Sequence, residues 1–116
     1  MDLLAPSAAP ENVKCYSSSS TAIRVTWTAA PTHNGIIVSY SVSYQAVGGS
    51  YEDSRTRHKQ VTGSSTQTDL TGLEESVIYN ITVSASTSAG KGPSSIEITV
   101  RTGEAGKTFN CDMLSL

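Results

Sequence analysis

The sequence predicts an all-β protein, a seven-stranded antiparallel β-sandwich. Short runs in which apolar and polar residues alternate recur along the chain, and turn-forming Gly, Pro and Asn residues separate them. The 9 Val and 7 Ile residues outnumber the 6 Leu residues, which favours strands because β-branched side chains fit a pleated sheet. No segment keeps a helical period over three turns. A chain of 116 residues is long enough for one such domain.

The alternation places the strands in order along the chain. We expect them at residues 13–15, 23–27, 40–44, 51–61, 66–70, 79–85 and 96–100, of which 51–61 is the weakest. Residues 1–9 have the composition of a linker, and the domain is expected to span residues 10–102. The alternation stops after the last strand, so residues 103–116 are predicted to be an irregular tail.

Composition and charge exclude several classes of function. A net charge of −2 argues against a dedicated nucleic-acid binder, and no apolar run is long enough to cross a membrane. Neither His-x-x-x-His nor Cys-x-x-Cys occurs, and the adjacent carboxylates would point to opposite faces of a strand. We therefore expect no enzyme activity, no cofactor and no metal. The first ten residues lack the features of a secretory signal, which fits an intracellular protein or a domain of a longer secreted or membrane-bound chain.

Several motifs occur in a fixed order between residues 10 and 102. They are Ile23-x-Val25-x-Trp27, Asn34-Gly35-x-Ile37-x-x-Tyr40-x-Val42-x-Tyr44, Leu73 six residues before Tyr79, and Ala85 followed by Gly90-x-Gly92-x-x-Ser95. In this order they resemble a fibronectin type III domain. The disulfide-centred immunoglobulin pattern is excluded, because the Trp lies on the second strand and Ile81 stands where that pattern has Cys.

The resemblance implies a sandwich of immunoglobulin-like topology with a core centred on the single Trp. The core residues are Trp27, Tyr40, Val42, Leu73, Tyr79, Ile81 and Val83. Once its ring is buried, Tyr79 needs a hydrogen-bond partner for its hydroxyl, and a backbone group of the preceding loop is the expected one.

The resemblance also implies a function. It indicates a non-catalytic extracellular module that acts as a spacer and protein-interaction unit, with neighbouring domains, in a cell-adhesion or receptor protein, in particular a neural adhesion molecule or a receptor-type tyrosine phosphatase. Two alternatives remain open: an intracellular structural module of a giant muscle-type protein, and a spacer attached to a secreted hydrolase. The intracellular alternative predicts a reduced Cys111 and no glycan.

Two loops at one pole are the predicted contact sites for protein partners. The candidate residues are His33, Asn34, Gly35, Gly90, Lys91 and Gly92. A second candidate is the row formed by Arg55, Arg57 and Lys59, which share one face of a strand. This row suits a polyanion, but we favour the interpretation that its charges protect a sheet edge from aggregation.

Asn80-Ile81-Thr82 is an N-glycosylation sequon, and alternation with buried Tyr79 and Ile81 points Asn80 outward. Asn80 is therefore a candidate glycosylation site. Cys15 falls at an inward position of the first strand, and Cys111 lies in the tail. We expect both cysteines to be unpaired, because a bridge between them would require the tail to fold back over the first strand.

Overall fold

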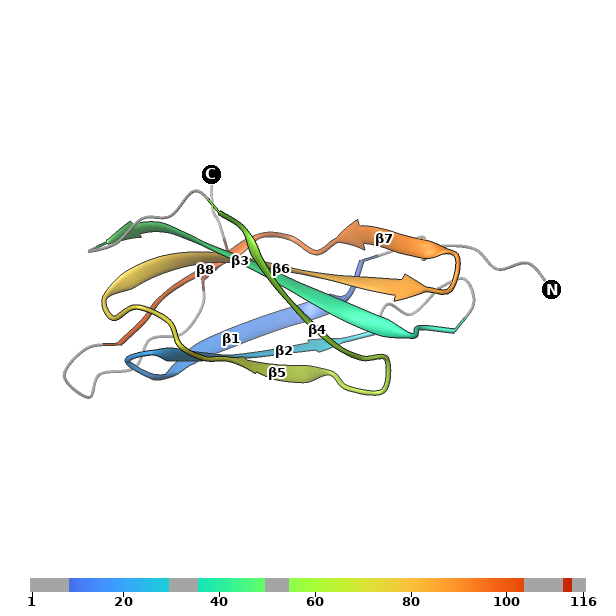
Figure 1. The fold of residues 1–116 in the computed structure, drawn as a ribbon, viewed down its shortest axis with the longest axis horizontal. Helices are drawn as coiled ribbons and strands as arrows, with labels where there is room; N and C mark the ends of the chain where they lie inside the picture. The colour runs from blue at the N-terminus through green and yellow to red at the C-terminus, as the bar shows by residue number, and fades with distance from the viewer. Residues whose placement is uncertain (1–8, 30–35, 50–54, 104–111, 114–116) are drawn as a thin grey trace.

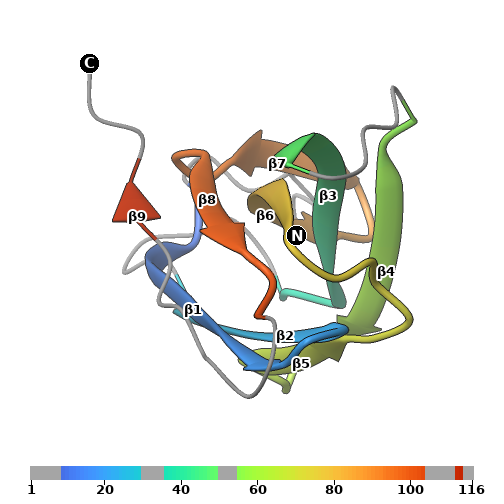
Figure 2. The ribbon, with the colours of Figure 1, turned by 90° about the vertical axis from the view of Figure 1, so that its left-hand side faces the viewer.

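The protein is an antiparallel sandwich of two β-sheets (Figures 1 and 2). A computed structural model describes residues 9–29, 36–49, 55–103 and 112–113. The smaller sheet has the strand order β1-β2-β5. These strands are β1 (Glu11–Ser19), β2 (Ala22–Thr28) and β5 (Gln67–Leu70).

The larger sheet has the strand order β4-β3-β6-β8-β9, with β7 beside the far end of β6. Its strands are β3 (Ser39–Gly49), β4 (Arg57–Thr62), β6 (Val77–Thr87), β7 (Gly90–Ser94), β8 (Ile98–Arg101) and β9 (Asp112–Met113). All neighbouring strands in both sheets run antiparallel. The predicted fold class is therefore confirmed.

The core follows from the alternation of side chains along the strands. In β2 and β6 every second residue is buried, so each strand presents an apolar face to the opposite sheet. All seven residues named above as the core are buried. Trp27 of the smaller sheet packs against Tyr40 of the larger one, with ring centroids 5.3 Å apart. This aromatic contact joins the two layers at the centre of the sandwich.

The structure contains two strands that the sequence analysis did not predict. The segment 90–94 was expected to be a loop, but it is strand β7 and pairs with the end of β6 through a turn at residues 88 and 89. Gly90 has a φ of 144°, a conformation that is open to glycine and costly for other residues. The glycines that indicated a loop therefore allow a tight hairpin.

The second unpredicted strand lies in the tail. Residues 112–113 form β9, which pairs with Ile98 and Thr99 of β8 at the edge of the larger sheet. The expectation of an irregular tail is thus wrong at these positions. The described part of the chain forms no helix of the length and hydropathy that a membrane crossing requires.

Candidate interaction surfaces and the residues that position them

The connection between β5 and β6 is held at Glu74 from both sides. The Glu74 N–H donates to the Tyr79 hydroxyl at 3.0 Å, and the Glu74 carbonyl accepts from the Thr102 hydroxyl at 2.6 Å. The Thr102 hydroxyl also accepts from the Val77 N–H at 2.9 Å, and Thr102 is 0 % exposed. Tyr79 and Thr102 thus fix the crossing from the smaller to the larger sheet, as the sequence analysis expected for Tyr79 alone.

Ser95 bridges the break between β7 and β8. Its N–H donates to the Val83 carbonyl at 2.8 Å, and its hydroxyl accepts from the Val83 N–H at 2.9 Å. The hydroxyl thus replaces a backbone carbonyl that the irregular segment cannot supply. Ser95 therefore keeps β7 and β8 in line on the same edge of β6, and this sets the position of the β6–β7 hairpin.

Only one of the two predicted contact loops can be placed. His33, Asn34 and Gly35 lie outside the described residues. Gly90, Lys91 and Gly92 belong to strand β7 and not to an open loop, because β7 pairs with the extended end of β6. Lys91 is exposed on this hairpin.

An apolar pair at the same end of the sandwich was missed by the sequence analysis. Ile36 and Val38 precede β3 and are 79 % and 53 % exposed. The Val38 N–H donates to the carbonyl of Ser86, whose register partner on β7 is Lys91. Figure 1 shows this segment and the β6–β7 turn at one end of the molecule. The only available signal was the unbroken apolar run 36–38, which lacks strand alternation.

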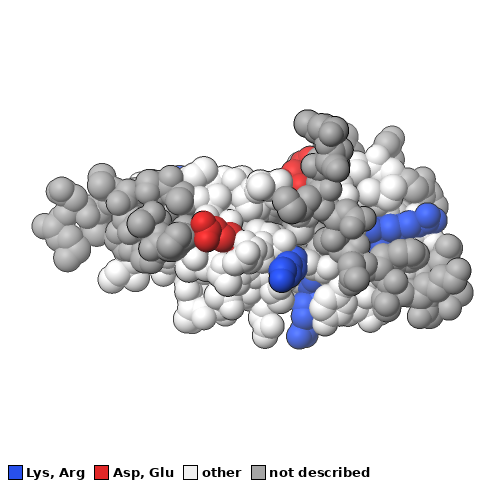
Figure 3. Space-filling view, turned by 180° about the vertical axis from the view of Figure 1, so that it is seen from behind, with Lys and Arg blue, Asp and Glu red and all other residues white. Residues whose placement is uncertain are grey.

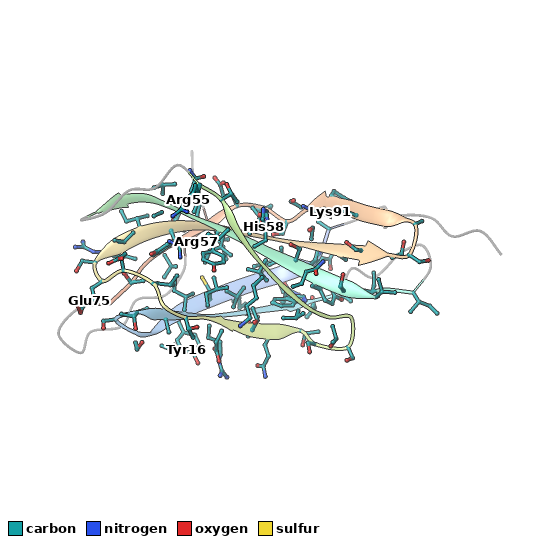
Figure 4. All side chains as sticks on the ribbon, viewed as in Figure 1. Tyr16, Arg55, Arg57, His58, Glu75 and Lys91 are labelled. Carbon is teal, nitrogen blue, oxygen red and sulfur yellow. The ribbon has the colours of Figure 1, made fainter. Side chains whose placement is uncertain are left out.

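The basic side chains of β4 have partners within the chain. The Arg57 guanidinium lies 5.9 Å from the centroid of the Tyr44 ring, and the Lys59 ammonium donates to the Asp69 carbonyl at 2.7 Å. Arg55 precedes β4, so it is not part of the strand on which it was expected, and it too interacts within the chain. Because β4 is the edge strand of the larger sheet, this arrangement favours edge protection over an open polyanion site. Arg57 and Lys91 lie well apart along the larger sheet (Figure 4).

The smaller sheet carries a well-formed ion pair on its outer face. Arg24 and Asp69 are register partners on β2 and β5 and form two hydrogen bonds, of 2.8 and 3.0 Å. The bond from Arg24 lowers the pKa of the Asp69 carboxyl from its ordinary value, although partial desolvation opposes this shift. The same bond raises the pKa of Arg24. Figure 3 shows few and scattered charged side chains among the described residues on the reverse side of the molecule.

Cys15 is disulfide-bonded, so the expectation that it is unpaired is wrong. No cysteine among the described residues is free. The only other cysteine in the sequence, Cys111, lies outside the described residues. The sequence had predicted an irregular tail that does not fold back over the first strand. Instead, β9 in the tail pairs with β8, and β8 contacts β1, the strand that contains Cys15. A groove of about 1030 Å³ lies between β1 and the start of β8, and Cys15, Ile96 and Ile98 are among the residues that line it.

The comparisons with known proteins agree with this architecture. A family model described as fibronectin type III domain matches residues 8–101. Receptor-type tyrosine-protein phosphatase F of Mus musculus is 43 % identical in an alignment of 103 residues that covers 85 % of this chain and 5 % of that protein. Protein sidekick-1 of Gallus gallus is 45 % identical in an alignment of 101 residues that covers 84 % of this chain and 4 % of that protein.

A solved structure shows the same fold. The solution structure of the fn3 domain of human contactin 1 has a TM-score of 0.76 and 32 % identity, and the match covers 91 % of this chain and 87 % of that one. The chain thus spans only about one twentieth of the length of the curated relatives it matches, but nearly the whole of a single solved domain.

Proposed function

The chain belongs to the fibronectin type III family, and on this premise we propose that it is an extracellular, non-catalytic module of a cell-surface adhesion or receptor protein. In this role it spaces neighbouring domains and contributes contact surface to protein partners. The relatives support this role, because a receptor-type tyrosine phosphatase and sidekick-1 contain a closely similar segment within much longer chains.

The disulfide at Cys15 is the observation that carries the extracellular part of the proposal. Disulfides persist in oxidising compartments and are rare in the cytosol, where thiols are kept reduced. An intracellular structural module, the main alternative, would hold reduced cysteines.

The location can be tested on the longer protein that carries this chain. Intact cells are labelled with a membrane-impermeant amine reagent, and the protein is then digested under non-reducing conditions. We expect labelled lysines of this chain and a disulfide-linked peptide that contains Cys15. Labelling only after permeabilisation, together with a free Cys15 thiol, would show that the module is intracellular.

The exposed apolar pair supports the contact role of the end formed by residues 36–38 and the β6–β7 hairpin. Exposed apolar side chains that lie together are typical of protein-interaction sites.

Ile36→Asp should weaken aggregation between cells that display the full-length protein. Ile96→Asp is the matched control, because Ile96 is 66 % exposed but lies on the β7–β8 connection. Equal loss in both variants would argue against this end as the contact surface.

A further inference from the structure

Asn80 is an uncommon residue type for its position within a strand of the larger sheet. It lies in the first half of β6, a strand that runs between β3 and β8 (Figure 2), and its register partners are Gln45 and Thr99. Asn is depleted in strands because it gains little from packing on a pleated surface. Its side-chain amide forms no hydrogen bond with any residue that the structure describes.

The side chain of Asn80 points away from the core. Tyr79 and Ile81, its neighbours in sequence, are 1 % and 0 % exposed, whereas Asn80 is half-buried on the outer face of the sheet. Side chains alternate between the two faces of a strand, so Ile78 and Thr82 lie on the same outer face as Asn80. A substituent on the Asn80 amide would therefore extend into solvent and leave the core packing unchanged.

The surroundings of Asn80 suit a carbohydrate. Gln45, Thr82 and Thr99 are half-buried and uncharged, and their amide and hydroxyl groups can both donate and accept hydrogen bonds. Thr82 also places a hydroxyl two residues after the asparagine, as the acceptor sequence requires. No other Asn-x-Ser/Thr triplet occurs among the 116 residues.

We propose that Asn80 carries an N-linked glycan that covers the central outer face of the larger sheet. The inference rests on the proposed extracellular location, because the sugar donor is available only to chains that enter the secretory pathway. The donor class is a polyprenyl-diphosphate-linked oligosaccharide. A bond forms between Asn80 Nδ2 and the sugar C1 as the bond from C1 to the diphosphate oxygen breaks. The amide loses one proton, the diphosphate departs with the bonding electrons, and nothing is oxidised or reduced.

A glycan at this position would decide which surfaces remain open to partners. Because β6 is flanked by β3 on one side and β8 on the other, a sugar chain on Asn80 would shield the outer face across these three strands. Protein contacts would then be confined to the outer face of the smaller sheet and to the ends of the sandwich. The exposed Ile36 and Val38 lie at such an end, because Val38 bonds to Ser86 near the end of β6, whereas Asn80 lies near its start.

The test uses the full-length protein secreted or displayed by animal cells. Wild type and Thr82→Ser keep an acceptor sequence, whereas Asn80→Gln and Thr82→Ala do not. We expect a peptide-N-glycosidase to convert Asn80 of wild type and Thr82→Ser to Asp, with a matching gain in gel mobility of the fragment that contains this chain. Neither change should occur in Asn80→Gln or Thr82→Ala.

The wild-type measurement decides the matter even where a variant fails to fold. A peptide from surface-displayed wild type that contains unmodified Asn80 before glycosidase treatment would overturn the glycan and leave the proposed extracellular function standing. A protein that never reaches the surface and has a free Cys15 thiol would overturn the proposed function, and the glycan with it. Conversion of Asn80 in wild type supports both.

Discussion

At the scale of single residues, the chain satisfies the backbone of its β5–β6 connection with two buried hydroxyls. Glu74 is exposed and in a loop, yet both its N–H and its carbonyl have side-chain partners. Such bonds stabilise modestly when formed, but removing one is costly where the group left behind is shielded from water and has no other partner. This asymmetry makes the two hydroxyls informative targets for substitution.

Tyr79→Phe should lower the free energy of unfolding by about 1–2 kcal/mol, because the Glu74 N–H loses its acceptor while the ring remains in the core. The measurement is chemical denaturation of both proteins. Tyr44→Phe is the matched control, since the Tyr44 ring lies 6.5 Å from that of Tyr79 but its hydroxyl is bonded to no described residue. Unchanged stability in Tyr79→Phe would show that the hydroxyl does not hold the crossing.

Thr102→Val tests the other side of Glu74. The substitution keeps the shape of the side chain but removes the donor to the Glu74 carbonyl and the acceptor for the Val77 N–H. We expect a loss of about 1–3 kcal/mol in unfolding free energy, the scale for buried groups left unpaired. Combined with Tyr79→Phe, the losses should not add, because both side chains act on the same backbone unit. Strict additivity would indicate that the two act independently.

The Arg24–Asp69 pair predicts a shallow dependence of stability on acid. The folded state holds the Asp69 carboxylate more strongly than the unfolded state, because Arg24 lowers its pKa from the ordinary value of 3.8. The stabilisation is therefore complete above that value and is lost as the pH falls through the lowered pKa. It should be small, since both side chains are more than two-fifths exposed.

Urea unfolding of wild type and Asp69→Asn between neutral pH and about pH 2 measures this effect. The two proteins should differ at neutral pH and converge in acid. Arg24→Gln should give the same profile as Asp69→Asn, because either change removes the pair. A difference between wild type and Asp69→Asn that persists at the acid end would exclude the ion pair as its cause.

Of the two side chains that bond to Glu74, only Tyr79 could be predicted from the sequence. Tyr79 could be identified because its spacing from Leu73 and its place in an alternating strand are visible in the sequence. Thr102 could not be identified as a partner, because its role depends on the end of β8 lying beside the start of β6, 25 residues earlier. Its inward position does continue the alternation of Ile98 and Val100, which was the one signal available.

At the scale of elements, the last strand is divided into β7 and β8, and Ser95 lies at the break and bonds to Val83 of β6. β7 pairs with the end of β6, β8 pairs with its beginning, and residues 95–97 lie between. The sequence predicted a loop and one strand here, because Gly and Pro in 90–94 are poor strand formers. Pairing with a long neighbouring strand outweighed that local preference. β9 was missed for a different reason, since two residues are too short for any alternation to appear.

Ser95→Ala should destabilise the protein by about 1–3 kcal/mol, because the buried Val83 N–H would lose its acceptor. Ser94→Ala is the control, since Ser94 is exposed and contributes to β7 through its backbone. Amide hydrogen exchange should show faster exchange at Val83 in Ser95→Ala only. Equal exchange rates at Val83 in both variants would contradict the bridging role of the hydroxyl.

At the scale of the whole molecule, a sandwich of two sheets has open sides where edge strands of different sheets meet. Here β1 and β8 meet at one such side, and the groove lined by Cys15, Ile96 and Ile98 lies along it. β9 covers part of the free edge of β8, which would otherwise expose unpaired backbone groups. Cys15 of β1 lines this groove, and its disulfide adds a covalent cross-link there.

Reduction of this disulfide should therefore destabilise the folded domain. A cross-link limits the conformations of the unfolded chain, and the loss on breaking it is about 2–4 kcal/mol. The unfolding midpoint of wild type should fall when a reductant is present, whereas Cys15→Ala should have the same lower midpoint with and without it. Ala keeps this buried position apolar, so the comparison isolates the cross-link from the packing of the side chain. Labelling should show that the thiols are free after reduction. If the wild-type midpoint is then unchanged, the disulfide does not stabilise the domain, and packing of the two sheets alone accounts for its stability.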